Sequence, residues 1–152
     1  MKISSSLEYA VRLMAALAKP AADRPLSAEH LARCENIPLD FATQILWRLK
    51  REAILASRRG ASGGFILARP PAEITLAQVA KAVDHAIFED VCGKYKEASK
   101  DCRHQGNCGI MPVWRRLADM VNGYLEKVTV ADICAQAEAA RMTASAGTNG
   151  ID

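Results

Sequence analysis

No hydrophobic run in the sequence is long enough to cross a membrane. The N-terminal stretch, MKISSSLEYAVRLMAALAKPAA, has an early lysine and several small residues, as a secretory signal does. Glu8 and Arg12 interrupt it, however, and leave only Leu13 to Ala18 as an unbroken apolar run. That run is shorter than the hydrophobic region of a signal peptide. We therefore expect a cytoplasmic protein that does not associate with a membrane.

Motifs of common enzymes are also missing. The sequence has no nucleotide-binding glycine motif, no Ser/His/Asp set that stands out, and no paired carboxylates for acid–base work. No internal repeat is visible. We therefore do not expect an enzyme, and a redox protein whose metal centre does chemistry is the less favoured alternative.

What the chain does have is enough apolar material for a core. Half of its 152 residues are hydrophobic, and this length predicts one domain, or one domain with an extension. The net charge of +3 is mildly basic. Such a charge does not by itself indicate a nucleic-acid ligand, so the basic residues have to be found on one face.

Three helices are predicted in the first 51 residues. Leu7, Val11 and Met14 recur at helical spacing, and Ser5-x-x-Glu8 resembles a capping box at the start of that first helix. Ser27 is a good N-cap for a short second helix, and the residues from 35 to 38 form a tight turn. Pro38 suits the first position of a third helix. A short helix, a turn and a longer helix are the outline of a helix-turn-helix.

The third helix is predicted to have two different faces. Phe41, Ile45 and Leu49 would face the core. Trp47 and a set of polar residues would lie on or near the other face. Trp47 and Trp114 are interpreted as packing residues. The polar set is Asp40, Thr43, Gln44, Arg48 and Arg51.

A basic hairpin follows the third helix. The stretches 54–57 and 65–67 can pair as strands, and RRGASGG joins them as a flexible basic turn. A hairpin with a basic tip directly after a recognition helix is a wing. We therefore predict a mainly α fold with a small β-hairpin, in which residues 1–72 form a winged helix-turn-helix that binds DNA.

The second half of the chain is predicted to contain a linker helix, a loop and dimerisation helices. Thr75-x-x-Gln78 is a capping-box candidate for the linker helix, and 73–111 also holds the cysteine-rich loop. An apolar stripe over 113–128 suits a core or a dimer seam, and 112–142 is assigned to dimerisation, with the last helix ending near Arg141. Residues 143–152 are small and polar, and we expect a disordered tail.

Three of the five cysteines, Cys92, Cys102 and Cys108, lie close together in a polar segment that cannot build a core. Thiolates tie down such a segment by binding a metal centre or forming a disulfide. Zinc, held with His104, usually requires the C-x2-C pairs that are absent here. An iron–sulfur centre, zinc and a metal-free thiol switch all stay open. Cys34 and Cys134 are interpreted as core cysteines.

Several segments together resemble the IscR/NsrR/RirA family of dimeric winged-helix regulators. They are PLDFATQILWRLKREAIL, RRGASGGFILARP, ITLAQVAKAVD and VTVADI. Members with three cysteines in this place bind an iron–sulfur cluster and control genes for cluster assembly, iron homeostasis or stress defence. The resemblance implies a homodimer on double-stranded operator DNA, with a 2Fe–2S or 4Fe–4S cluster held by Cys92, Cys102 and Cys108.

The resemblance also implies DNA contacts. Arg59 matches the wing arginine that enters the minor groove, and Asp40, Thr43 and Gln44 match base-contacting positions. Gln44 suits adenine, and Asp40 suits either a cytosine amino group or the helix dipole. The full expected set is Ser27, Pro38, Leu39, Asp40, Thr43, Gln44, Arg48, Arg51, Arg58, Arg59, Ser62 and Gly63.

This chain departs from the family pattern at three places. The interval from Cys92 to Cys102 is longer than usual, and Met111 stands where cluster-assembly regulators have a histidine ligand. Glu8, from the partner subunit, is the hypothesised fourth ligand, because it matches a first-helix carboxylate of some relatives; its alternative role is in the capping box with Ser5. Ala53 replaces a usual glycine, at a cost of about 1 kcal/mol if its backbone is left-handed.

Overall fold

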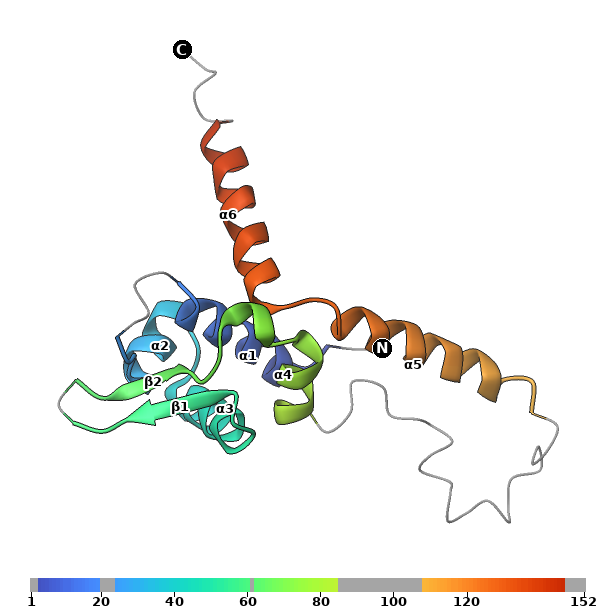
Figure 1. Ribbon diagram of the computed structural model, residues 1–152, viewed down its shortest axis with the longest axis horizontal. Coiled ribbons are helices and arrows are strands. Elements are labelled where there is room, and N and C mark those ends of the chain that lie inside the picture. The colour runs from blue at the N-terminus through green and yellow to red at the C-terminus, as the bar shows by residue number, and fades with distance from the viewer. Residues whose placement is uncertain (1–2, 20–23, 61, 85–107, 147–152) are drawn as a thin grey trace.

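The first part of the chain is a winged helix (Figure 1), seen in a computed structural model that describes residues 3–19, 24–60, 62–84 and 108–146. It consists of α1 (Ser5–Leu17), α2 (Ala28–Glu35), α3 (Leu39–Arg51), β1 (Leu55–Arg58), β2 (Gly64–Leu67), the 3-10 turn η1 (Pro71–Glu73) and α4 (Leu76–Val83). Two further helices follow, α5 (Met111–Leu125) and α6 (Val130–Ala146). The predicted class, mainly helical with a small hairpin, is confirmed.

Helix α1 starts with a different cap from the predicted one. The backbone N–H of Leu7 donates to the hydroxyl of Ser4 at 3.1 Å, so Ser4 is the N-cap and Ser5 already belongs to the helix. The predicted Ser5–Glu8 capping box is therefore wrong. A cap side chain reaches the N–H three residues ahead, and Ser4 in extended conformation meets this requirement one residue earlier.

Helices α2 and α3 form the predicted helix-turn-helix. The hydroxyl of Ser27 accepts from the N–H of His30 at 3.1 Å, and Asn36, with φ 52°, closes the turn in left-handed conformation. Pro38 is the N-cap of α3 rather than its first helical residue. The prediction that Phe41 faces the core is wrong, since 48% of it is exposed; it lies at the edge of the buried stripe and meets Tyr9 of α1 edge-on at 6.4 Å.

The wing is an antiparallel pair in which Leu55 lies opposite Leu67 and Arg58 opposite Gly64. Leu26 adds an isolated antiparallel bridge beside β2. Its N–H and carbonyl both bond to the backbone of Phe65, at 3.0 and 2.8 Å. A Cβ at position 64 would collide with the Leu26 backbone, which explains a glycine there. The hairpin lies beside α3 and projects beyond the helices (Figure 1).

The hydrophobic core is formed by helices α1, α2, α3 and α4 together with the start of α6. Its fully buried side chains include Leu13, Met14, Leu46, Val79 and Val130. The predicted capping box of Thr75 and Gln78 is confirmed at the start of α4. Backbone bonds from Leu76 N–H to the carbonyl of residue 128 (2.8 Å) and from Val130 N–H to that of residue 74 (2.9 Å) join the start of α6 to the start of α4, and α6 packs against α1 and η1.

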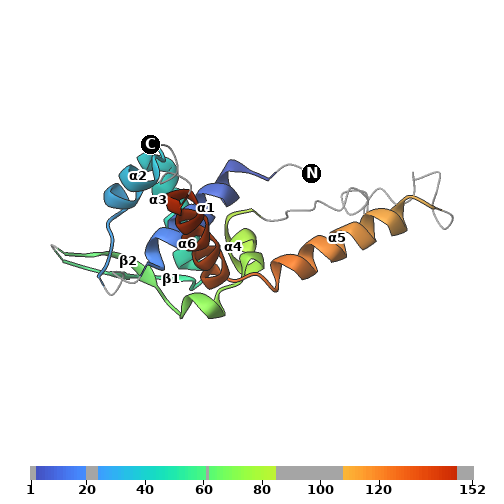
Figure 2. The same ribbon diagram turned by 90° about the horizontal axis from the view of Figure 1, so that it is seen from above.

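Helices α5 and α6 extend from this body in different directions (Figures 1 and 2). Helix α6 ends at Ala146, past the predicted end near Arg141, so 143–146 is helical rather than part of a tail. Within the described part of the chain, no helix is both long and apolar enough to span a bilayer.

One prediction of burial fails at the surface. Cys34 is exposed because Leu31 and Ala32 form the buried face of α2, and its thiol lies 3.5 Å from Nε2 of His30. Trp47 and Trp114 are 56% and 48% exposed. Cys134, in contrast, packs against the core as predicted, and this burial raises the pKa of its thiol.

Candidate functional site

The outward face of α3 is polar and accessible. The buried residues of this helix all lie on its opposite side: Ala42, Ile45, Leu46 and Leu49. Asp40, Gln44 and Arg51 are exposed, and Thr43 is half-buried beside them. Pro38 and Leu39, the latter 44% exposed, lie at the N-terminal end of this face. The arrangement leaves hydrogen-bonding side chains free to meet a ligand surface.

Arg48 is exposed, and one nitrogen of its guanidinium is bound within the protein. Its Nη1 donates to the carbonyl of Val83, the last residue of α4, at 2.9 Å. Arg51 lies 3.9 Å from the exposed carboxylate of Glu52, and a pair of this kind contributes little to stability. Because a guanidinium has five N–H donors, both arginines keep donors for an external anion.

The wing tip presents Arg58, Arg59 and Ser62 to solvent. Gly60 has φ 118°, a conformation that L side chains rarely adopt. The N–H of Gly63 bonds to the Gly60 carbonyl at 2.9 Å, and a Cβ on Gly63 would lie 2.8 Å from that same oxygen. The glycines therefore make a narrow turn that allows two adjacent arginines to approach a phosphate backbone closely.

Ser27 lies where α2 begins. Its hydroxyl caps the helix, and it also helps to lower the pKa of Glu29, behind the larger effect of the Glu29 backbone N–H. The first N–H groups of a helix attract anions, and here the Glu29 carboxylate already provides one. A contact of Ser27 with DNA stays a prediction.

One of the three predicted cluster cysteines lies within the described residues. Cys108 is half-buried just before α5, and the N–H of Met111 donates to its sulfur at 3.4 Å. Hydrogen bonds of this kind stabilise the negative charge on a metal-bound thiolate, so Cys108 fits a ligand role. Cys92, Cys102 and His104 lie outside the described residues. Among those described, no three His, Cys, Asp or Glu side chains gather to hold a metal.

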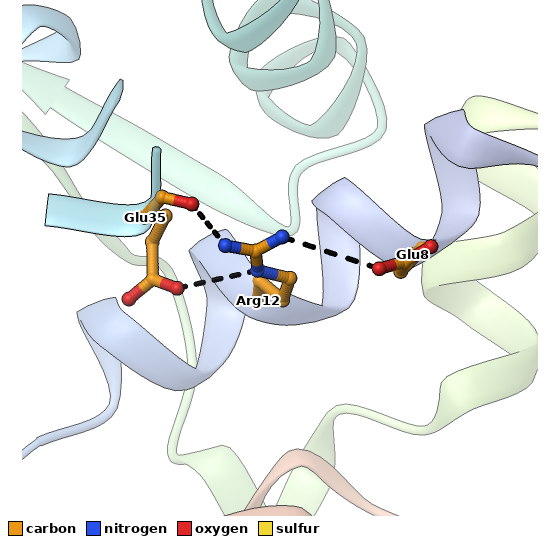
Figure 3. A network of polar contacts seen from close by, with 3 residues as sticks. All are labelled: Glu8, Arg12 and Glu35. Carbon is orange, nitrogen blue, oxygen red and sulfur yellow. Dashed lines mark hydrogen bonds and ion pairs between the residues drawn. The ribbon is translucent and has the colours of Figure 1, made fainter. Parts of the chain in front are cut away.

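Glu8 lies on the exposed side of α1 and belongs to a network with Arg12 and Glu35 (Figure 3). Nη1 of Arg12 is 4.0 Å from the Glu8 carboxylate, and its Nε is 3.4 Å from that of Glu35. Arg12 also donates to the backbone carbonyl of Glu35, at the end of α2. The Glu8 side chain is 63% exposed, so it stays accessible to a further ligand.

The end of α4 is held by two contacts that sequence reasoning missed. The hydroxyl of Ser4 bonds to the carboxylate of Asp84, and Arg48 bonds to the Val83 carbonyl. These contacts attach the last residues before 85–107 to α1 and to α3. No local signal in the sequence could reveal them, because the partners are 80 and 35 positions apart.

Comparison with known proteins agrees with this architecture. Residues 3–136 match the Rrf2 family, described as "Iron-dependent Transcriptional regulator". The protein MT1325 of Mycobacterium tuberculosis (strain CDC 1551 / Oshkosh), named as an HTH-type transcriptional regulator, is 34% identical over 136 residues, 88% of this chain and 81% of its own. The regulator IscR of Serratia proteamaculans (strain 568) is 27% identical over 133 residues, which are 88% of this chain and 79% of the relative.

The fold of this chain is also similar to those of solved structures. IscR of T. potens superposes with a TM-score of 0.70 at 25% identity, covering 92% of this chain and 90% of its own. CymR of B. subtilis, titled a global cysteine regulator, superposes with a TM-score of 0.67 at 24% identity over 90% and 98% of the two chains. From its sequence match and its winged-helix fold, this chain belongs to the Rrf2 family of transcription regulators.

Proposed function

We propose that the protein is a homodimeric, DNA-binding regulator that senses redox state, nitric oxide or iron status through an iron–sulfur cluster. The observation that carries the proposal is the position of the wing. Arg58 and Arg59 are exposed toward its tip, strand β1 of the wing packs beside α3, and Arg48 of α3 bonds to the end of α4, which the cysteine segment follows in the chain. The proposed DNA-reading surface and the proposed sensing segment would thus be joined through α4.

DNA is the ligand that suits the reading surface. Gln44 and Thr43 can hydrogen-bond base edges in the major groove, while the arginines of the wing can contact phosphates or the minor groove. Arg59→Ala should weaken operator binding by about 1–3 kcal/mol and leave any cluster spectrum unchanged. Unchanged affinity across a salt series would remove the wing from the interface.

The exposed face of α5 supports a dimer. Its apolar residues follow one stripe of the helix: Ile110, Val113, Trp114, Leu117, Met120, Val121 and Tyr124. Four of them are more than 60% exposed, which is unusual for large apolar side chains on a monomer surface. A second copy crossing this stripe would bury it, and a two-fold dimer would bind a pseudo-palindromic operator.

The cluster ligands that we propose are Cys92, Cys102 and Cys108, with Glu8 of the other protomer as fourth. A bound cluster would supply a redox-active centre that is sensitive to oxygen, nitric oxide or loss of iron. Glu8 offers a hard oxygen that an incoming molecule can displace. Through Arg12 it lies next to the end of α2, so a change at Glu8 could reach the helix-turn-helix.

Anaerobic purification tests the proposal. The protein should absorb in the visible range and contain iron and acid-labile sulfide, and its affinity for DNA selected from a random pool should depend on the cluster. Cys92→Ala, Cys102→Ala and Cys108→Ala should each abolish or labilise the cluster, whereas the control Cys34→Ala should not. Full cluster content in any of the three variants would remove that residue from the site.

Glu8 needs its own comparison. Glu8→Ala should change the spectrum and stability of the cluster while helix content stays nearly intact. A spectrum and a signal response that equal those of the wild type would exclude Glu8 and favour His104 or an external ligand.

A second candidate is a thiol switch of the same fold, either metal-free or with bound zinc. The exposed Cys34 thiol, 3.5 Å from Nε2 of His30, favours it, because an oxidant can reach an exposed thiol. The anaerobic experiment separates the two candidates. A colourless protein whose DNA affinity changes with peroxide, and not with iron, would support the switch.

A further inference from the structure

The indole of Trp47 lies in the middle of the outward face of α3. Although tryptophan is a large apolar residue, 56% of Trp47 is exposed. Counted along the helix from Asp40, the positions of Thr43, Gln44 and Trp47 are i+3, i+4 and i+7. At about 100° per residue, Asp40 and Trp47 differ by only about 20° around the helix axis. A recognition helix presents residues at this spacing to the floor of the major groove.

Two neighbours hold the indole in place without covering it. Phe65 of the wing meets the ring edge-on, with 6.4 Å between centroids and an interplanar angle of 86°. Nζ of Lys50 lies 4.6 Å from the ring centroid. The ring is therefore oriented before any ligand arrives, which lowers the entropy lost on binding.

The surroundings of the ring suit DNA better than an apolar protein partner. Trp47, Arg48, Lys50 and Arg51 line a shallow hollow of about 440 Å³. Its wall combines an indole with the aliphatic stems of three cationic side chains. An apolar protein surface placed here would desolvate those charges without supplying a counter-ion of its own, whereas DNA brings phosphates together with apolar groups on the bases.

We infer that Trp47 is a specificity-determining residue that packs against the C5 methyl group of a thymine in the major groove of each half-site. Among the four bases, only thymine presents an apolar group on that side. The inference rests on the proposed DNA-binding function and adds to it a preference at one base-pair position. Gln44 and Trp47 would then read neighbouring base pairs, one by hydrogen bonding and the other by apolar contact.

The test removes single methyl groups from the DNA. Full-length protein is titrated by fluorescence anisotropy with a duplex selected from a random pool, and each thymine is replaced in turn by deoxyuridine. At one thymine position in each half-site, replacement by deoxyuridine should lower the affinity of the wild-type protein for the duplex about fourfold. This is the effect expected when one buried methyl group is lost. Trp47→Ala should bind the normal duplex more weakly and show no loss on uracil substitution at that position.

Two variants distinguish this contact from a structural role of the indole. Trp47→Phe keeps an apolar ring beside Phe65 and should keep the sensitivity to the methyl group. Gln44→Ala removes a neighbouring contact and should also keep it. Because every protein is compared with itself on two duplexes, a general weakening of the wing cancels.

The outcomes separate the inference from the proposed function. A Trp47→Ala protein that loses the same affinity as wild type at every substituted thymine overturns the role of Trp47, while DNA binding stands. The role of Trp47 is also overturned if no deoxyuridine substitution in the duplex lowers the affinity of the wild-type protein. A protein that selects no sequence from the pool overturns both.

Discussion

Ala53 has a left-handed backbone, with φ 54°, directly after the C-cap residue of α3. Its N–H bonds to the carbonyl of Lys50 at 3.0 Å, so the chain reverses there to enter the wing. In this conformation the Cβ lies too close to the following carbonyl, a strain that glycine avoids. The single methyl group of Ala53 thus opposes the turn that positions the hairpin.

We expect Ala53→Gly to stabilise the protein by about 1 kcal/mol in chemical denaturation, because the relief of strain exceeds the added entropy of the unfolded chain. The matched control is Ala137→Gly on the exposed surface of α6, where the backbone is helical. There the same substitution should destabilise by about 0.5–1 kcal/mol if α6 unfolds with the rest of the protein. A loss of stability at both sites would contradict the account of position 53.

At the scale of single elements, the helix ends are the most informative part of the structure. Ser4 accepts from the Leu7 N–H and also bonds to Asp84, so one hydroxyl starts α1 and holds the end of α4. Ser5, its neighbour, is exposed inside the first turn. Substitutions at these two neighbouring serines therefore compare the contribution of an N-cap with that of an ordinary helical position.

Ser4→Ala should lower the free energy of unfolding by at least about 1 kcal/mol, whereas Ser5→Ala should change it by less than about 0.5 kcal/mol. Both can be measured by urea denaturation with a common slope. Equal losses, or a larger loss for Ser5→Ala, would restore the capping box with Glu8.

The start of α6 predicts a pH dependence. Both the hydroxyl and the N–H of Thr129 donate to the Asp132 carboxylate, at 2.7 and 2.8 Å, and they lower its pKa, the hydroxyl having the larger effect. A carboxyl group whose pKa is lowered by folding stabilises the folded protein at pH values above its ordinary pKa of about 3.9. This stabilisation is lost as the pH falls through the lowered pKa of the folded state. Unfolding measured from pH 5 to pH 2 should thus be less pH-dependent for Asp132→Asn. Parallel curves would exclude Asp132 as a source of the dependence.

What could be predicted from the sequence was encoded locally. Ser27, and Thr75 with Gln78, cap helices through bonds that span three residues, and each prediction is confirmed. The exposure of Phe41 and Cys34 could not be predicted, because it depends on where neighbouring elements pack. The candidate site divides in the same way: the exposure of Gln44 and Arg59 follows from periodicity and turn residues, whereas the bond from Arg48 to Val83 depends on tertiary structure.

At the scale of the whole molecule, the uncovered stripe of α5 predicts the assembly. Leu117→Asp would place a charge in the proposed dimer seam and should weaken dimerisation by about 3 kcal/mol, roughly a hundredfold in Kd. Asn122→Asp adds the same charge to the opposite side of α5 and serves as the control. Sedimentation over a concentration series should find the Kd of the first variant raised about a hundredfold over wild type and that of the second unchanged. A wild-type monomer that still binds its operator would overturn the dimer.

The two contacts at the end of α4 also affect how freely the length of the following segment can vary. Ser4 and Arg48 hold the residues before 85, and the backbone bonds of residues 128 and 130 hold the C-terminal end of α5, the helix that follows residue 108. Between two held ends, doubling the length of a connecting chain costs only about 0.6 kcal/mol of closure entropy. The long interval from Cys92 to Cys102 is therefore compatible with an unchanged winged helix. A fold joined in this way can exchange one sensing segment for another while its DNA-reading half keeps the same shape.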